Sequence, residues 1–166
     1  MPTNFYMFFV SALIPMVIGF IYYSEALFGK KWMKVNGFTK EQLESGNMVV
    51  ILGVSYLMSV LLSFGLSGIV IHQGNVFQVM MPEVMEAGSA AETTFNEFMA
   101  TYGDRHRGFG HGVLHGVLFT ILIALPIISI NALFEQRGWA YIGIHFGYWL
   151  LTTTAIGALL CGTLVY

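Results

Sequence analysis

The stretch MVVILGVSYLMSVLLSFGLSGIVI at residues 48–71 contains no Asp, Glu, Lys or Arg. At 1.5 Å rise per residue, a helix over it would be about 36 Å long, enough to cross the roughly 30 Å hydrocarbon core of a bilayer. Three further apolar stretches, at about residues 5–23, 109–130 and 139–165, are equally free of formal charge. The sequence therefore predicts an all-α polytopic membrane protein, in which four transmembrane helices pack as a bundle and residues 1–166 form one integral membrane domain.

The overall composition leads to the same class of protein. Of the 166 residues, 56% are hydrophobic and 10% are charged, whereas about 25% of an average soluble domain is charged. A soluble helical bundle would need polar outer faces that these segments lack. The formal net charge of −2 excludes a basic nucleic-acid-binding protein. We expect membrane lipid and other membrane-protein subunits as partners, and no nucleic acid.

The distribution of positive charge predicts how the chain is oriented. Four lysines follow the first segment and one arginine lies in the third loop, namely Lys30, Lys31, Lys34, Lys40 and Arg137. The opposite side carries only Arg105 and Arg107, beside five acidic residues. Because cytoplasmic loops are enriched in Lys and Arg, we expect both termini outside a bacterial cytoplasmic membrane. Lys30, Lys31, Trp32 and Trp139 are interpreted as anchors at the membrane interface.

The loop at about residues 72–107 is the largest piece outside the predicted spans, and it is apolar for a loop. Apolar residues recur at near-helical spacing in its first half, and a second helix is predicted to start near Ala90. We interpret the loop as an interfacial amphipathic helical segment between the second and third spans. A docking surface or lid is the alternative, since Met-rich faces adapt to ligands. In the first loop, Thr39 is a candidate N-cap for a short helical turn.

Two stripes of small residues are predicted to mediate helix packing. They are Ser55, Ser59, Ser63 and Ser67 in the second span and Gly108, Gly112 and Gly116 before and within the third. Small residues at every fourth position allow helices to approach closely in lipid. The stripes could face each other within one chain or meet between subunits, and the serine row could also line a polar pore.

The histidines are the one group that could carry chemistry. His111 and His115 are four residues apart and share one face of the third helix, while His72 ends the second span on the same side of the membrane. Two neutral imidazoles with a third ligand from another element suit Zn²⁺ or another transition metal. His106, Asp104 and Glu97 are near in sequence. The alternative is that the imidazoles hydrogen-bond with one another, with a carbonyl or with a serine hydroxyl. His145 is placed at a different depth, outside this group.

A set of residues spread over most of the chain is shared with a known family. These residues are Gly19, Phe20, Tyr22, Tyr23, Ser24, Leu27, Phe28, Gly29, Lys30, Trp32, Met33, Gly46, Asn47, Met48, His111, Gly112, Leu114, His115, Gly116, Leu125, Pro126, Asn131, Phe134, Glu135, Arg137, Gly147, Tyr148 and Trp149. In them the chain resembles the DUF1761 family of small membrane proteins. Glu25 stands where family members often have proline. The resemblance implies four spans and an important His-Gly segment, but no reaction and no ligand.

Three functions from different classes follow from these observations. The chain has no nucleotide-binding loop, nucleophile elbow or cysteine pair, which favours a protein that is not an enzyme. We expect a structural or accessory subunit that acts through helix packing in a homo-oligomer or a larger membrane complex. The alternatives are a small transporter or channel, and a metal- or cofactor-binding membrane protein that uses His111 and His115.

Overall fold

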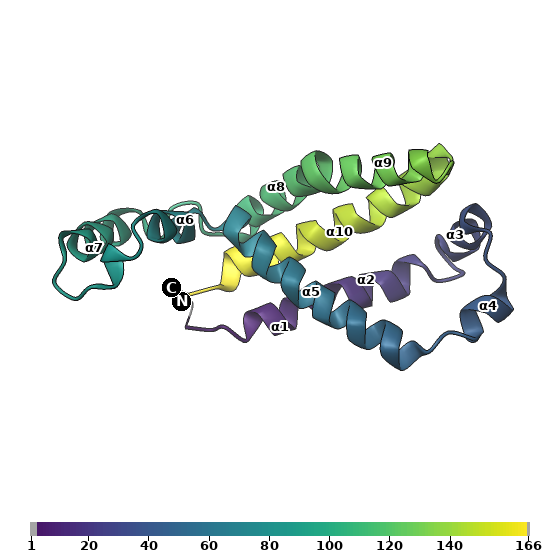
Figure 1. The fold of residues 1–166 in the computed structure, drawn as a ribbon, viewed down its shortest axis with the longest axis horizontal. Coiled ribbons are helices and arrows are strands. Elements are labelled where there is room, and N and C mark those ends of the chain that lie inside the picture. Colours follow the sequence, from purple (N-terminus) through teal and green to yellow (C-terminus); the bar gives the residue numbers. More distant parts are fainter. Residues whose placement is uncertain (1–2, 166) are drawn as a thin grey trace.

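The structure is a computed structural model that describes residues 3–165, and the regular structure in that part of the chain is entirely helical (Figure 1). Three helical stretches are long and apolar enough to cross a membrane: α5 (Met48–Val70), the continuous run Phe109–Phe134, and α10 (Trp139–Thr163). The predicted second, third and fourth spans correspond to these three. An integral membrane protein is the class that such helices indicate.

The segment predicted at residues 5–23 is helical but shorter and not uniform. It consists of α1 (Met7–Ser11) and α2 (Ile14–Tyr22), with a turn between them at Ala12 and Leu13. Pro15 stands in the first turn of α2, where a missing N–H costs no helical hydrogen bond. The proline therefore marks the start of a new helix rather than a kink inside a long one.

The third predicted span extends beyond its expected end at residue 130. It comprises α8 (Phe109–Phe119), the π-helical turn η2 (Thr120–Ala124) and α9 (Leu125–Phe134). Pro126 stands in the first turn of α9, directly after the π-helical turn. A single π-helical turn inside an α-helix widens the backbone spacing locally. Pro126 thus lies where the π-helical turn ends and the α-helix begins again.

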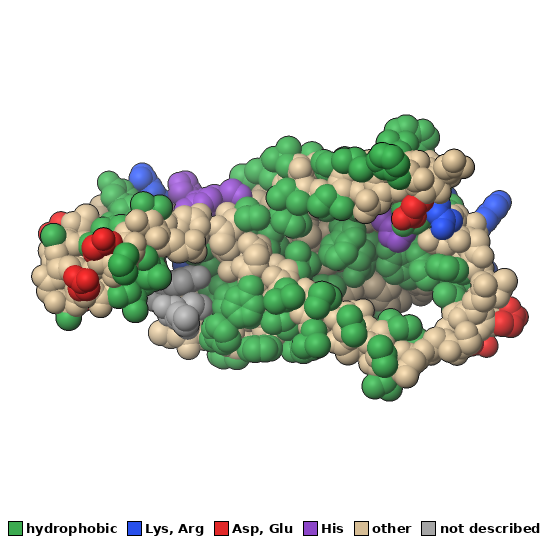
Figure 2. All heavy atoms as spheres, in the orientation of Figure 1, with side chains coloured by type: hydrophobic (Ala, Val, Ile, Leu, Met, Phe, Trp, Pro, Cys, Tyr) green, Lys and Arg blue, Asp and Glu red, His purple; other side chains and the backbone are tan. Residues whose placement is uncertain are grey.

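The helices contact each other around a small shared core. Helix α8 packs mainly along α10, and α1 and α2 lie against both α5 and α10. Phe8, Leu66, Val70, Ile156 and Leu160 are almost fully buried where these helices meet. The outer faces are strongly apolar (Figure 2), and in α5 most side chains are exposed. Such outward apolar faces fit lipid as the surrounding solvent.

Both ends of the described chain lie at the same end of the molecule. The backbone N–H of Thr3 donates to the carbonyl of Val165 at 2.7 Å. Figure 1 shows α6 (His72–Val79) and α7 (Ala90–Tyr102) projecting from this end, joined by the short 3-10 helix η1 (Glu83–Met85). Helix α7 begins at Ala90, as the sequence predicted, and its N-cap Ser89 accepts a hydrogen bond from the backbone of Glu92.

The opposite end of the molecule holds two short helices, α3 (Gly29–Asn36) and α4 (Lys40–Glu44). Thr39 caps α4 as predicted, because its hydroxyl accepts from the backbone N–H of Gln42 while the Gln42 side chain accepts from the Thr39 backbone. Helix α3 was not predicted. The tip between α9 and α10 also lies at this end (Figure 1), so Arg137 and the loop that carries all four lysines come together.

Candidate metal centre

The three histidines predicted as metal ligands converge at one place. Helix α5 ends at Val70, and Ile71 adopts an extended conformation (φ −120°, ψ 97°) before α6 begins at His72. This turn directs His72 toward the start of α8, where His111 and His115 occupy successive turns of one face. Two neighbouring elements thus supply three imidazoles.

The distances among these rings are short. The Nε2 atoms of His72 and His111 lie 3.1 Å apart, and the His115 ring centroid is 4.9 Å from that of His72 and 4.4 Å from that of His111. One nitrogen from each of the three rings lies within 4.8 Å of the other two. Two nitrogens bound to one tetrahedral Zn²⁺ are about 3.3 Å apart, given Zn–N bonds of about 2.05 Å. The separation between the His72 and His111 nitrogens is close to this value.

The 3.1 Å separation also fits a hydrogen bond between neutral imidazoles, with one ring donating and the other accepting. Such a hydrogen bond would link only His72 and His111, however, and would leave out His115. The third ring needs its own partner, and no hydrogen bond to the side chain of His115 is found among the described residues. A cation at the centre would satisfy all three nitrogens at once.

The site is accessible from outside the helices. His72 is exposed, and His111 and His115 are half-buried. Figure 2 shows histidine side chains on the surface at the junction between the main helices and the projecting α6–α7 part. A cavity of about 240 Å³ adjoins the site and is lined by His72, Gln73, Val76, Phe98, Tyr102, Arg105 and His106. An ion can therefore reach the imidazoles from the aqueous side.

The other candidate residues do not join the three converging histidines. The His106 ring stacks on that of His111, with ring centroids 5.1 Å apart. Asp104 and Glu97 are exposed and do not belong to the group of converging ligands. His145 lies apart, as predicted, and its Nδ1 is 3.3 Å from the Tyr23 hydroxyl. The converging set is therefore composed of imidazoles alone.

The glycine stripe meets α10 within the same chain, not the serine stripe. A Cβ atom at Gly116 would lie 2.5 Å from the carbonyl oxygen of Thr153, and one at Gly157 would lie 2.5 Å from that of Gly112. Gly108 is the N-cap of α8 and has no such neighbour. This close approach holds the histidine-bearing face of α8 in place.

The four serines of the stripe differ in burial and in hydrogen bonding. Ser63 is fully buried and its Oγ lies 2.9 Å from that of Ser11 in α1. The hydroxyls of Ser59 and Ser63 also donate to the carbonyls four residues before them, and Ser67 donates to Phe64. Ser55 is exposed. Among the described residues, Ser63 is thus the member of the stripe whose hydroxyl bonds to another helix.

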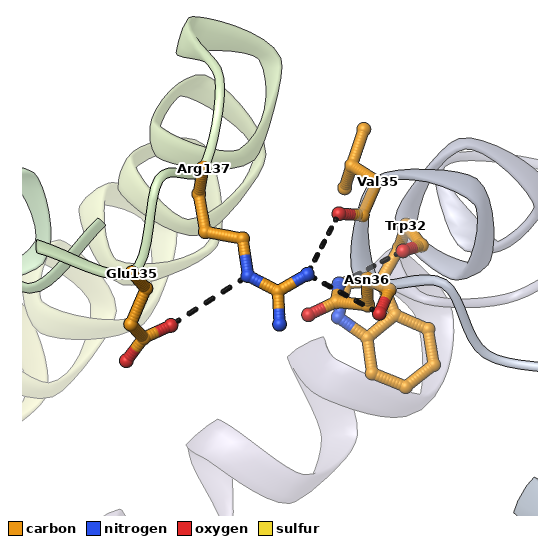
Figure 3. Close-up of polar contacts among 5 residues, drawn as sticks. All are labelled: Trp32, Val35, Asn36, Glu135 and Arg137. Atoms are coloured by element: carbon orange, nitrogen blue, oxygen red, sulfur yellow. Dashed lines mark hydrogen bonds and ion pairs between the residues drawn. The ribbon is translucent and has the colours of Figure 1, made fainter. Parts of the chain in front are cut away.

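The predicted interface anchors lie at the end opposite the histidines. Lys30, Lys31 and Trp139 are exposed, whereas Trp32 is half-buried and packs on Tyr23 with ring centroids 5.2 Å apart. Sequence analysis missed a polar contact at this end. Figure 3 shows Arg137 reaching the carboxyl end of α3, where its Nη1 donates to the carbonyls of Val35 and Asn36 at 3.4 and 3.3 Å.

Comparison with known proteins gives one match. The model of a family described as "Protein of unknown function (DUF1761)" matches residues 6–161, nearly the whole chain. Neither the curated proteins nor the solved structures contain a match. The match covers all three converging histidines, so the candidate metal centre lies within the shared part of the chain.

Proposed function

The chain belongs to the DUF1761 family, and since that family's description names no activity, we propose from the side chains that this is a membrane protein that binds a transition-metal ion. The observation that carries the proposal is the convergence of His72, His111 and His115. Three neutral nitrogen donors, without carboxylate or thiolate, suit Zn²⁺, Cu²⁺, Ni²⁺ or Co²⁺ better than Mg²⁺ or Ca²⁺.

The proposed architecture has four crossings in one domain over residues 1–166. In it, α1 and α2 together form the fourth crossing and complete a bundle with α5, the α8–α9 run and α10. The hydrogen bond between Thr3 and Val165 supports an even number of crossings, because it places both ends at one side. Phe5 and Tyr6 before α1, and Leu27 and Phe28 after α2, add apolar length to this stretch.

The proposed location is a bacterial cytoplasmic membrane with the metal centre on the outer side. The five basic residues Lys30, Lys31, Lys34, Lys40 and Arg137 belong to the end that holds α3, α4 and the α9–α10 tip. That end would face the cytoplasm under the positive-inside rule. The histidines, at the opposite end, would then take their ion from outside the cell.

The direct test is the metal content of the purified protein. The protein would be extracted in mild detergent with an affinity tag that contains no histidine, and metals would be counted by mass spectrometry. We expect about one ion per chain in the wild type and none in the His111→Ala, His115→Ala double variant. His145→Ala is the matched control, because it also removes an imidazole but leaves the cluster intact. A wild type without stoichiometric metal, after incubation with Zn²⁺ and removal of free ion, contradicts the proposal.

The apolar surface of the α6–α7 part supports a second candidate function. Val79 is 85% exposed and Met85 is 68% exposed, and both lie in the part that projects beyond the other helices (Figure 1). Such side chains are suited to contact with a membrane surface or a second protein. An accessory subunit, as a homo-oligomer or beside another membrane protein, would use this surface.

Native mass spectrometry of gently extracted protein tests the second candidate. A defined homo-oligomer or a co-purifying chain that is lost in a Val79→Ser, Met85→Ser variant supports it. A monomer with bound lipid only, unaffected by these substitutions, contradicts it. The metal measurement is independent of this result, since His111 and His115 lie in α8 whereas Val79 and Met85 lie in the projecting α6–η1 part.

A further inference from the structure

His106 lies beside the three converging histidines but is not one of them. Its ring stacks on that of His111 with ring centroids 5.1 Å apart and an interplanar angle of 24°. It also lines the cavity of about 240 Å³ that His72 lines. Its nitrogens fall outside the group in which all ligand atoms lie within 4.8 Å. To reach an ion at the centre of that group, the His106 side chain has to rotate.

The backbone around His106 is held on both sides. The carbonyl of His106 accepts a hydrogen bond from the buried Cys161 thiol at 3.4 Å. The buried side chain of Gln73 donates to the carbonyl of Arg105 at 2.8 Å. The Arg107 guanidinium donates to the carbonyl of Cys161 in α10 and to that of Leu164, the residue after α10. The His106 backbone is therefore fixed beside the three converging histidines, while its side chain is exposed.

The conformation of His106 is itself unusual. Its φ of 58° lies in the left-handed region, which costs a residue with a Cβ atom about 1–2 kcal/mol. Residues held in such conformations are concentrated at functional sites. Glycine would occupy this position more easily.

A metal ion held by three histidines still lacks one ligand, since Zn²⁺ in proteins is usually four-coordinate. We propose, building on the metal site above, that His106 is the fourth ligand. His72 is the first residue of α6, and His106 lies three residues before Phe109, the first residue of α8. One ion bound to both would therefore close the projecting segment 72–106 at its two ends. Closing a long loop in this way restricts the unfolded and open states of the segment.

A closed four-histidine site differs from an open three-histidine site in a measurable way. An open site keeps a position for water or an added anion, whereas a closed structural site does not. The metal would then position α6 and α7 on the membrane domain and perform no hydrolytic chemistry. The α6–α7 surface would keep a fixed position relative to the membrane domain only when metal is bound.

The experiment uses Co²⁺ in the full-length protein and records its visible absorption with and without azide. We expect azide to leave the wild-type spectrum unchanged and to shift that of His106→Gly, which gains an open coordination position. The glycine suits the left-handed backbone, so folding is preserved. Gln136→Gly is the matched control, because Gln136 has a φ of 55° at the other end of the molecule.

Limited proteolysis of the segment 72–106 provides a second readout. We expect metal to protect this segment in the wild type and in Gln136→Gly but not in His106→Gly, which should also bind Co²⁺ at least about tenfold more weakly. A wild type whose cobalt spectrum shifts with azide, or a His106→Gly variant that retains full protection, overturns the assignment of His106 alone. A wild type that binds no Co²⁺ overturns the metal site itself and this inference with it.

Discussion

Gly112 in α8 and Gly157 in α10 approach so closely that a Cβ atom on Gly157 would lie 2.5 Å from the Gly112 carbonyl oxygen. Real side chains do not reach that separation, so any larger residue must push the helices apart. Because α8 carries His111 and His115, this contact also sets where these two proposed metal ligands lie.

Gly157→Ala is predicted to destabilise the protein by about 1–3 kcal/mol, since overpacking a tight contact costs that much. The measurement is a thermal unfolding curve in detergent. Gly110→Ala is the matched control in α8, because a Cβ there meets no atom within 4 Å and alanine favours a helix. Equal stability of the two variants would show that the helices do not meet at Gly157.

Ser63→Ala is predicted to cost about 0.6 kcal/mol, the average found for hydrogen bonds between transmembrane helices. The substitution removes the contact between the Ser63 and Ser11 hydroxyls, which are both fully buried. Ser55→Ala, at an exposed position of the same stripe, should be neutral. Comparing the two variants in one unfolding assay separates loss of an interhelical bond from a general effect of serine. A larger loss for Ser55→Ala would contradict the packing described here.

Arg137→Ala is predicted to loosen α3 by about 1.5 kcal/mol, the lower end of the range for hydrogen bonds that involve a charged group. The guanidinium donates hydrogen bonds to two backbone carbonyls at the carboxyl end of α3 (Figure 3). The last carbonyls of a helix have no hydrogen-bond partner within the helix. Hydrogen exchange of residues 29–36 should become faster. Glu135→Ala is the control, because it removes only the 3.6 Å ion pair with Arg137. Unchanged exchange in Arg137→Ala would contradict this role.

The proposed orientation predicts which loops react from outside the cell. A membrane-impermeant maleimide should label Gln78→Cys in α6 and should not label Ser45→Cys beside α4. Both positions are exposed, so the difference reports the side of the membrane. The wild type is the unlabelled control, since its single cysteine, Cys161, is buried. Labelling of Ser45→Cys alone would reverse the orientation.

The charge-free stretches allowed the long helices to be predicted, because burial in lipid excludes charge along a whole span. The convergence of the three histidines could also be predicted, since the spacing of His111 and His115 fixes one helix face and His72 ends the neighbouring span. The break between α1 and α2 could not be read from hydropathy, which is uniform across it. Pro15 was the local signal for a new helix start.

The partner of the glycine stripe could not be deduced from the stripe itself. A helix face made of small residues can pack closely against the small residues of any other helix. A signal was present in α10, where Thr153, Gly157 and Cys161 recur at every fourth position. The contact of Arg137 with α3 was missed because it joins two loops that are far apart in sequence. Such contacts depend on how the loops fold, and the fold of a loop cannot be predicted from a local sequence pattern.

The hydrogen bond between Thr3 and Val165 has a consequence for engineering. Because the two ends meet, a short linker could join residue 165 to residue 3, and new ends could be opened in the exposed turn around Gly37, whose φ of 72° suits a glycine turn. Such a circular permutant would keep every interhelical contact while its ends moved to the opposite end of the molecule. The order in which the helices are synthesised could thus be varied independently of how they pack.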